Sequence, residues 1–147
     1  MILNGENVTA YIRKEEVGNM ASATSVYPKV REKLVELQKE LAKKSNVIMA
    51  GRDIGSCVLP DAQVKIYLTA SVQTRAKRRY DELKEKGVSC NIEEIQKDIE
   101  DRDYRDMHRE MSPLKQAEDA VLLDSSELNI DEVVLAIEKI CKEKGIV

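Results

Sequence analysis

The sequence predicts an α/β fold in which helices flank a parallel, doubly wound sheet. Short continuous apolar runs predict buried strands at residues 46–50 (NVIMA), 63–69 (QVKIYLT) and 120–126 (AVLLDSS). Segments with the apolar spacing of amphipathic helices separate these runs, an alternation typical of parallel sheets covered by helices. At 147 residues, without internal repeats or Gly/Ser-rich linkers, residues 1–147 have the size of a single domain.

A hairpin turn and two helices are predicted before the first strand. Asn4-Gly5 is a hairpin-type turn signal. Residues 15–26 predict a short helix. Pro28 suits the first turn of a longer helix. The apolar residues on one face of that helix are Val30, Leu34, Leu37 and Leu41.

Three further helices are predicted after residue 70. Ser71 can cap a helix that Gly87 ends. Asn91 with Glu94 resembles a capping box, and it opens a helix that runs into the charged stretch EDRDYRDMHRE. The apolar side of this helix carries Ile92, Ile95 and Ile99. A last amphipathic helix from about residue 130 is predicted to turn inward Val133, Val134, Ile137, Ile140 and Cys141.

Composition excludes several classes of function. The net charge is -3, so no global basic field attracts nucleic acid or an anionic membrane. No apolar run approaches the ~20 residues that span a bilayer, and the N-terminus has no signal-peptide pattern. The three cysteines are far apart and form no CxxC pair. Neither a metal site nor a disulfide framework is therefore predicted, and the expected compartment is the cytoplasm.

The charged pair Arg52 and Asp53 follows the first predicted strand, between Gly51 and Gly55. In open parallel sheets, ligands bind beyond the carboxyl ends of the strands. One interpretation is that the guanidinium binds an anion and the carboxylate accepts from a donor on the ligand. The other is a loop ion pair or a helix cap. The spacing alone favours neither.

A second charged cluster lies in the predicted helix around DRDYRDMHR. Arg102, Asp106 and Arg109 share one helical face, at i, i+4 and i+7. Arginine forks suit phosphate oxygens, and a carboxylate between them suits a sugar hydroxyl. Taken alone, the stripe is better explained as a solvated face with surface ion pairs. His108, the single histidine, is expected at the surface.

A third cluster, RAKRR at residues 75–79, contains Arg75, Arg78 and Arg79. It is interpreted either as a mobile basic cover over phosphates or as an exposed helix face, and in isolation the exposed face is favoured.

Read together, these clusters resemble the bacterial cytidylate kinases. The resemblance is carried by SATSVYPKVRE, GRDIGSCVLPDAQVKIYLTAS, RAKRRYDELKEKG and RDYRDMHREMSPLKQAEDAVLLDSS, which occur in the order and spacing of that family. It runs from about Gly5 to the C-terminus. The GRDxG-x(4)-PDA and RD-x-RD-x-x-R stretches are specific motifs.

The resemblance implies a P-loop-kinase-like sheet with a helical lid at about residues 71–112, and it implies roles for particular residues. The family transfers the γ-phosphoryl group of ATP, with Mg²⁺, to CMP or dCMP. By resemblance the catalytic arginines are Arg52, Arg102 and Arg109. The ribose would contact Ser22, Arg102 and Asp106, the cytosine Arg31 and Asp53, and the acceptor phosphate Arg52 and Arg109. The lid arginines facing ATP would be Arg75, Arg78 and Arg79.

The sequence departs from the family in one motif. The six glycines, at 5, 18, 51, 55, 87 and 145, do not frame the G-x-x-x-x-G-K-[ST] P-loop with which the family opens. The resemblance therefore implies an N-terminally truncated kinase without its ATP-phosphate cradle or its central strand. Little or no kinase activity is expected from this chain alone, and binding of ATP and Mg²⁺ is not expected to be strong.

Two functions follow from this departure. The chain is either part of a (d)CMP kinase that needs a P-loop segment, or a non-catalytic nucleotide-binding or oligomerising module. Loss of a central strand would leave strand edges exposed, and such edges predict a homodimer or larger self-association.

Overall fold

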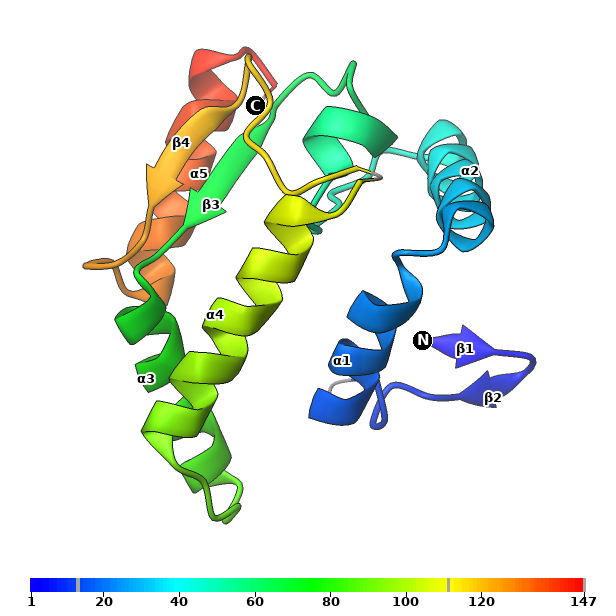
Figure 1. Ribbon diagram of the computed structural model, residues 1–147. Coiled ribbons are helices and arrows are strands. Elements are labelled where there is room, and N and C mark those ends of the chain that lie inside the picture. Colours follow the sequence, from blue (N-terminus) through cyan, green and yellow to red (C-terminus); the bar gives the residue numbers. More distant parts are fainter. Residues whose placement is uncertain (13, 111, 147) are drawn as a thin grey trace.

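The computed structural model describes residues 1–12, 14–110 and 112–146, which form short strands and five α-helices (Figure 1). The strands are β1 (Ile2–Leu3), β2 (Glu6–Asn7), β3 (Ile66–Thr69) and β4 (Val121–Asp124). The helices are α1 (Glu15–Thr24), α2 (Pro28–Lys44), α3 (Val72–Glu85), α4 (Ile92–His108) and α5 (Ile130–Glu143). A short π-helical turn, η1, spans Ile54–Val58.

Local sequence signals explain most element boundaries. Asn4 and Gly5 both have positive φ (50° and 88°), as a two-residue hairpin turn requires, and β1 pairs antiparallel with β2. Pro28 begins α2. The Ser71 hydroxyl accepts from the Thr74 amide and caps α3, and the Asn91 side chain accepts from two amides at the start of α4. The predicted hairpin and helices are thus confirmed, as are the caps at Ser71 and Asn91, although Glu94 does not return the second hydrogen bond of a capping box.

The sheet is smaller than predicted. β3 and β4 form a two-stranded parallel pair with Ile66 opposite Val121 and Thr69 opposite Asp124. The predicted strand at residues 63–69 is confirmed only over 66–69, and the one at 120–126 over 121–124. The α/β class and the parallel pairing are confirmed. The β4 strand is only partly buried, since Leu122 is exposed.

The predicted strand at residues 46–50 is wrong. This segment is extended without sheet hydrogen bonds, and Ile48 is fully exposed. The physical reason is that an apolar run becomes a strand only when a neighbour completes its hydrogen bonds. Within the part of the chain that the structure describes, no segment lies beside residues 46–50 to do so.

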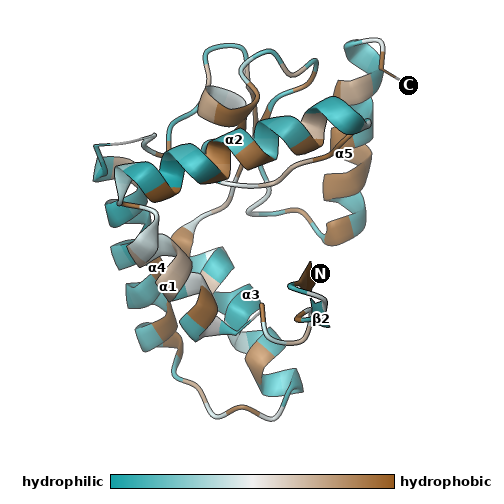
Figure 2. Cartoon of the chain, turned by 90° about the vertical axis from the view of Figure 1, so that its right-hand side faces the viewer, coloured by the Kyte–Doolittle hydropathy of each residue, from teal (hydrophilic) through white to brown (hydrophobic). Residues whose placement is uncertain are grey.

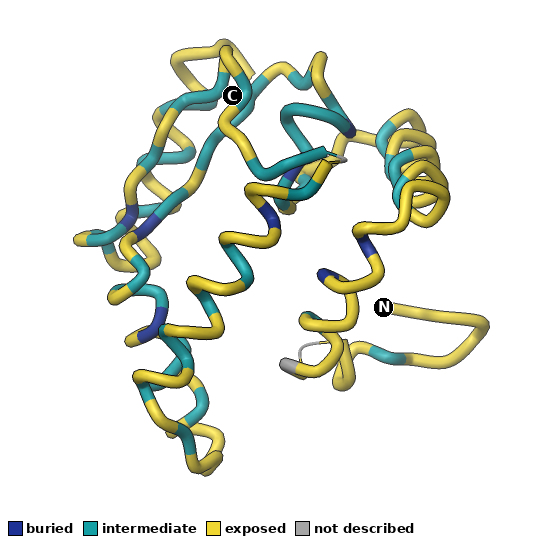
Figure 3. Tube along the Cα trace, in the orientation of Figure 1, coloured by how far each residue is buried: buried dark blue, intermediate teal, exposed yellow. Residues whose placement is uncertain are grey.

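Little apolar surface is buried. The buried hydrophobic residues among those described are Val58, Ala70 and Ala76, and most of the trace in Figure 3 is exposed. On α5, Val134 is exposed rather than turned inward as predicted, because that helix has no neighbour on this side among the described residues. In the described ranges, no helix has both the length and the apolar character to cross a membrane.

Candidate functional site

A cluster of arginines and aspartates joins four elements of the structure. The loop before η1 supplies Arg52 and Asp53, and α2 supplies Arg31. Helix α4 and its C-cap supply Arg102, Asp103, Asp106 and Arg109, and the first turn of α3 supplies Arg75. We call these eight residues the polar cluster.

The loop that carries Arg52 and Asp53 turns sharply after Gly51. A Cβ at Gly51 would lie 2.8 Å from Cγ1 of Ile54, so a larger residue there would force the Ile54 side chain to move. The backbone amides of Cys57 and Val58, in η1, donate hydrogen bonds to the Asp53 carbonyl and hold the loop in place. The absence of a side chain at Gly51 thus lets the Ile54 side chain lie against the loop that carries the charged pair.

Asp53 is buried against two arginines. It forms an ion pair with Arg31, whose side chain is 11% exposed, and its Oδ1 lies 3.9 Å from Nη2 of Arg109. Asp53 therefore does form an ion pair, as one of the two interpretations of the sequence predicts. Its partners lie outside the loop, however: Arg31 in α2 and Arg109 at the C-cap of α4. Asp53 caps no helix with its side chain.

Asp106 is the centre of the cluster. Its carboxylate lies 3.2 Å from Nε of Arg52, 3.9 Å from Nε of Arg102 and 3.6 Å from Nη1 of Arg109. The Ser22 hydroxyl, from α1, donates to it at 3.5 Å. The predicted stripe on α4 is therefore not a solvated face, because Asp106 is 3% exposed.

Asp103 connects the cluster to α3, and the sequence reasoning missed it. Its Oδ1 accepts from Arg52 at 3.1 Å and its Oδ2 lies 2.6 Å from Nη2 of Arg75. Burial alone would raise the pKa of Asp103, but hydrogen bonds from Arg75 and Arg52 outweigh burial and hold the pKa below its ordinary value. Its i, i+3 spacing from Asp106 placed it on the same helical face and could have revealed it.

Arg109 is held mainly by backbone and hydroxyl oxygens. Its Nε donates to the Ser112 carbonyl at 2.7 Å, and its Nη1 donates to the Ser25 hydroxyl at 3.4 Å. Burial lowers the pKa of Arg109, and the charge of Arg31 lowers it further. Ser25 is a second residue that the sequence reasoning missed.

The polar cluster carries excess positive charge and unsatisfied groups. Its five arginines outnumber its three aspartates by two. Four buried side-chain atoms make no hydrogen bond among the described residues: Arg31 Nε, Arg102 Nε, Asp106 Oδ2 and Arg109 Nη2. Three of them still face an opposite charge, because Asp106 Oδ2 lies 3.2 Å from Arg52 Nε and 3.9 Å from Arg102 Nε, and Arg109 Nη2 lies 3.9 Å from Asp53 Oδ1. Unsatisfied buried polar atoms are rare in folded proteins. Here all four belong to one cluster, as expected of a site that binds a polar ligand.

The three predicted lid arginines lie in different surroundings. Arg75 joins the polar cluster through Asp103. Arg78 donates to the carbonyls of Ser125 and Leu128, at the end of β4. Arg79 pairs with Glu82 on its own helix. Only Arg75 is therefore brought to the cluster, although α3 and α4 pack against each other as a helical pair.

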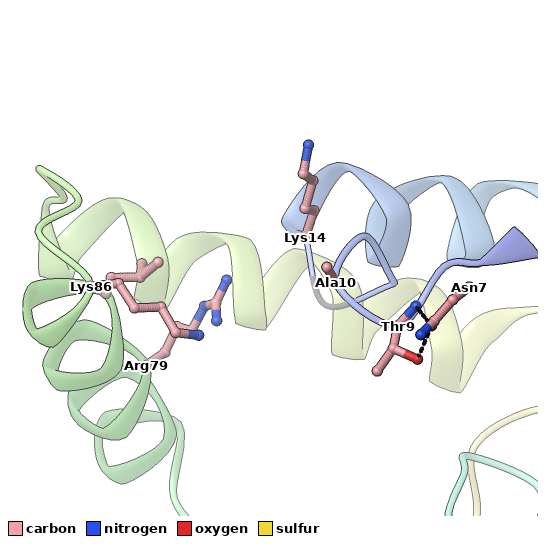
Figure 4. Close-up of a pocket in the computed structure, with 7 residues that line it drawn as sticks. Asn7, Thr9, Ala10, Lys14, Arg79 and Lys86 are labelled. Carbon is pink, nitrogen blue, oxygen red and sulfur yellow. Dashed lines mark hydrogen bonds between the residues drawn. The ribbon is translucent and has the colours of Figure 1, made fainter. Parts of the chain in front are cut away.

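Two cavities lie near these residues. The larger, of about 800 Å³, separates the N-terminal segment from α3, with Arg79 and Lys86 on one wall and Asn7, Thr9 and Lys14 on the other (Figure 4). Both α3 cations already pair with Glu82. The smaller, of about 260 Å³, is lined by Ser22, Tyr104, Asp106 and Arg109 among others. We assign the candidate site to the smaller cavity, because Asp106 and Arg109, two of the four residues with an unpartnered buried atom, line it.

The rim of the smaller cavity carries the single histidine. His108 is exposed, as predicted, and its ring stacks on that of Tyr104 with centroids 4.1 Å apart. Within the described residues, no group of three or more His, Cys, Asp or Glu side chains is arranged to hold a metal ion.

Residues 1–143 match the family model described as "Cytidylate kinase". The chain is 53% identical over 142 residues to proteins named cytidylate kinase from Lactobacillus gasseri and Lactobacillus johnsonii. It is 54% identical over 132 residues to a cytidylate kinase of Streptococcus pneumoniae (strain Hungary19A-6). These alignments cover 97% and 90% of this chain but 62% and 59% of those proteins, so the chain spans about three-fifths of their length.

Proposed function

The chain belongs to the cytidylate kinase family, and from this membership we propose that the polar cluster binds the acceptor nucleotide of a (d)CMP kinase reaction. The observation that carries the proposal is the set of four unsatisfied buried atoms on Arg31, Arg102, Asp106 and Arg109. A nucleoside monophosphate offers hydroxyl, phosphate and base groups that could satisfy them. The two excess positive charges match the charge of a phosphate monoester near neutral pH.

The geometry supports different roles for different residues of this site. Arg52 and Arg109 are proposed to bind the acceptor phosphate, since guanidinium groups bind phosphate oxygens in pairs. Asp106, with Ser22 and Arg102 beside it, is proposed to accept from ribose hydroxyls. Tyr104 and His108 would then lie at the rim of the ribose-side cavity.

The Arg31–Asp53 pair is proposed to select cytosine. A carboxylate accepts from the exocyclic amine of cytosine, and a guanidinium donates to the ring nitrogen and carbonyl. Uracil presents a carbonyl where cytosine has its amine, and that oxygen would face the Asp53 carboxylate. Such a buried mismatch leaves two acceptors opposed and disfavours UMP.

The described residues do not fit ATP and Mg²⁺. The three lid arginines already have protein partners, and the described carboxylates form no metal-binding group. The sequence contains no P-loop motif to hold the β- and γ-phosphates. We therefore derive no phosphoryl-transfer step for these 147 residues, and we propose that the chain by itself binds acceptor without turnover. The three free cysteines suit the cytoplasm as its compartment.

Titration calorimetry with CMP, dCMP, UMP and AMP tests the proposal. We expect CMP and dCMP to bind with affinities from high micromolar to millimolar, about -4 to -5 kcal/mol, and UMP and AMP to bind more weakly. Asp53→Asn should narrow the difference in affinity between CMP and UMP, because the asparagine amide can donate to the uracil carbonyl. Asp61→Asn, an exposed aspartate farther along the same loop region, is the matched control. Equal affinity for CMP, UMP and AMP in the parent chain would contradict the assigned roles.

A further inference from the structure

Asp103 joins two arginines that come from different elements. Its Oδ1 accepts from Nη1 of Arg52 at 3.1 Å, and its Oδ2 lies 2.6 Å from Nη2 of Arg75. The Asp103 side chain is 15% exposed, whereas the two arginines are 32% and 33% exposed. Asp103 belongs to α4, which packs against α3, and the two helices lie side by side in Figures 1 and 2. One carboxylate thus connects the loop before η1 with this helical pair.

Each of the two arginines is held through two of its nitrogen atoms. On Arg52, Asp103 accepts from Nη1, and Asp106 Oδ2 lies 3.2 Å from Nε. On Arg75, Nε donates to the Ala70 carbonyl at 3.1 Å, and Nη2 faces Asp103. Among the described residues, Nη2 of Arg52 makes no hydrogen bond. This amino group is therefore available to a ligand, on a side chain that solvent still reaches.

Asp103, rather than Asp106, sets the direction of the Arg52 guanidinium. The contact between Asp103 and Arg52 is a hydrogen bond, which weakens steeply when its angle changes. Asp106 Oδ2 makes no hydrogen bond among the described residues, so it acts on Arg52 through its charge. Loss of Asp103 would therefore let the guanidinium turn, whereas loss of the Asp106 charge would leave it held by Asp103.

We infer that Asp103 is a positioning residue for the acceptor phosphate: it holds Arg52 with Nη2 available to a phosphate oxygen, and Arg75 anchors Asp103 in turn. The inference rests on the proposed function, in which Arg52 binds that phosphate. An arginine that is already held loses less side-chain freedom when it binds a ligand. Arg75 thereby acts as the partner of Asp103, in place of the ATP-facing role that the resemblance implies.

Nuclear magnetic resonance of the arginine guanidinium groups tests the positioning without a ligand. Rotation about a Cζ–Nη bond is slowed when the amino group donates to a carboxylate, because a charge-assisted hydrogen bond must break first. We expect slow rotation at Nη1 of Arg52 in the parent chain and faster rotation in Asp103→Ala. The Arg52 signal is the one lost in Arg52→Lys. Asp101→Ala, at an exposed aspartate of the same helix, is the matched control and should change nothing.

Titrations with CMP and cytidine, followed by nuclear magnetic resonance into the millimolar range, test the effect on the phosphate. Asp103→Ala should weaken CMP binding about threefold to tenfold, the scale of immobilising one long side chain. Cytidine has no phosphate, so its affinity should stay the same. In an Arg52→Ala background, Asp103→Ala should cause no further weakening, because the two residues act as one unit. Arg75→Ala should weaken CMP binding in the parent chain but not in Asp103→Ala.

Other roles of Asp103 give different results. A purely electrostatic role predicts tighter CMP binding in Asp103→Ala, because a negative charge is removed from the site. A purely structural role predicts equal weakening of CMP and cytidine. Either result would overturn the inference, as would an Arg52 guanidinium that rotates equally fast in the parent chain and in Asp103→Ala. Asp103→Asn keeps the size and one acceptor oxygen, so it should show a smaller effect in the same direction and serves if circular dichroism shows that Asp103→Ala has lost its helices.

Failure of the proposed function is a separate result. A parent chain that binds neither CMP nor cytidine would contradict the proposed function, and the rotation of the Arg52 guanidinium alone would then decide whether Asp103 positions Arg52.

Discussion

Replacing Asp106 by asparagine removes the most buried charge of the polar cluster at almost constant size. Removing one partner of a fully buried ion pair costs about 3–5 kcal/mol. The side chains of Arg52 and Arg102 are 32% and 38% exposed, however, so water partly solvates the charges that Asp106 would leave unpaired. We therefore expect Asp106→Asn to lower the unfolding free energy by about 2 kcal/mol, which corresponds to a melting temperature about 4–8 °C lower for a chain of this size.

The same substitution should strengthen the binding of inorganic phosphate. The formal excess of positive charge in the cluster rises from two to three, so a phosphate anion is attracted more strongly. A ligand that binds only the folded chain raises the melting temperature according to its affinity. Phosphate should accordingly raise the melting temperature of Asp106→Asn by more than that of the parent chain, although the variant starts lower.

Thermal unfolding followed by circular dichroism measures both effects, with chloride at equal ionic strength as the reference salt. Asp101→Asn is the matched control, because Asp101 is exposed on the same helix, and it should change the unfolding free energy by less than about 0.5 kcal/mol. Equal stability of Asp106→Asn and the parent chain would refute the argument that Asp106 compensates buried arginines. A smaller phosphate effect in the variant would refute the assignment of an anion site.

Three further predictions concern activity, acid stability and a helix cap. A coupled assay of this chain with ATP, Mg²⁺ and CMP should give background rates, and turnover within tenfold of a typical ~10 per second would contradict this. Because the pKa of Asp103 is lower in the folded state, its stabilising contribution is complete above the ordinary carboxyl pKa and is lost as pH falls through the lowered value. Denaturant unfolding should therefore show stability falling below about pH 4, and less steeply in Asp103→Asn. By the same measurement, Asn129→Ala should lower the free energy of unfolding by about 1 kcal/mol, because Asn129 caps α5. Asn46 caps no helix, so the control Asn46→Ala should lower it by less than about 0.5 kcal/mol.

Signals that act within a few residues predicted the local structure well. Ser71, Asn91 and the Asn4-Gly5 turn behave as the sequence indicates, because capping and turn formation depend on adjacent backbone. The capping box at Asn129 and Glu132, with both of its hydrogen bonds present, was not recognised. Its pattern, Asn followed three residues later by Glu before an apolar run, was available in the sequence.

Features that depend on distant partners were predicted less well. Residues 46–50 have the composition of a strand, but composition cannot supply the neighbour that a strand requires. The same holds for the apolar face of α2, where periodicity indicated a buried side that the described chain does not cover. The pattern of apolar residues identifies a surface that can be buried, but it does not identify the segment that covers that surface.

The candidate site was predicted in outline because its residues form a set of specific motifs. Ser22, Arg31, Arg52, Asp53 and Asp106 come together from separate segments, as the resemblance implied. The sequence did not reveal which ion pairs and hydrogen bonds these residues form with one another. Their spacing does not reveal that Asp103 bridges two arginines or that Ser25 accepts from Arg109.

Half of the residues that this fold buries, among those described, belong to the site. Ser22, Ser25, Asp53 and Asp106 are buried there, and the other buried residues are Val58, Ala70, Ala76 and Ser125. Burying charge stabilises a fold only when partners compensate it, and the cluster is left two positive charges in excess. On the proposed function, an anion in the site would compensate this excess charge, and we expect folding and nucleotide binding to be coupled.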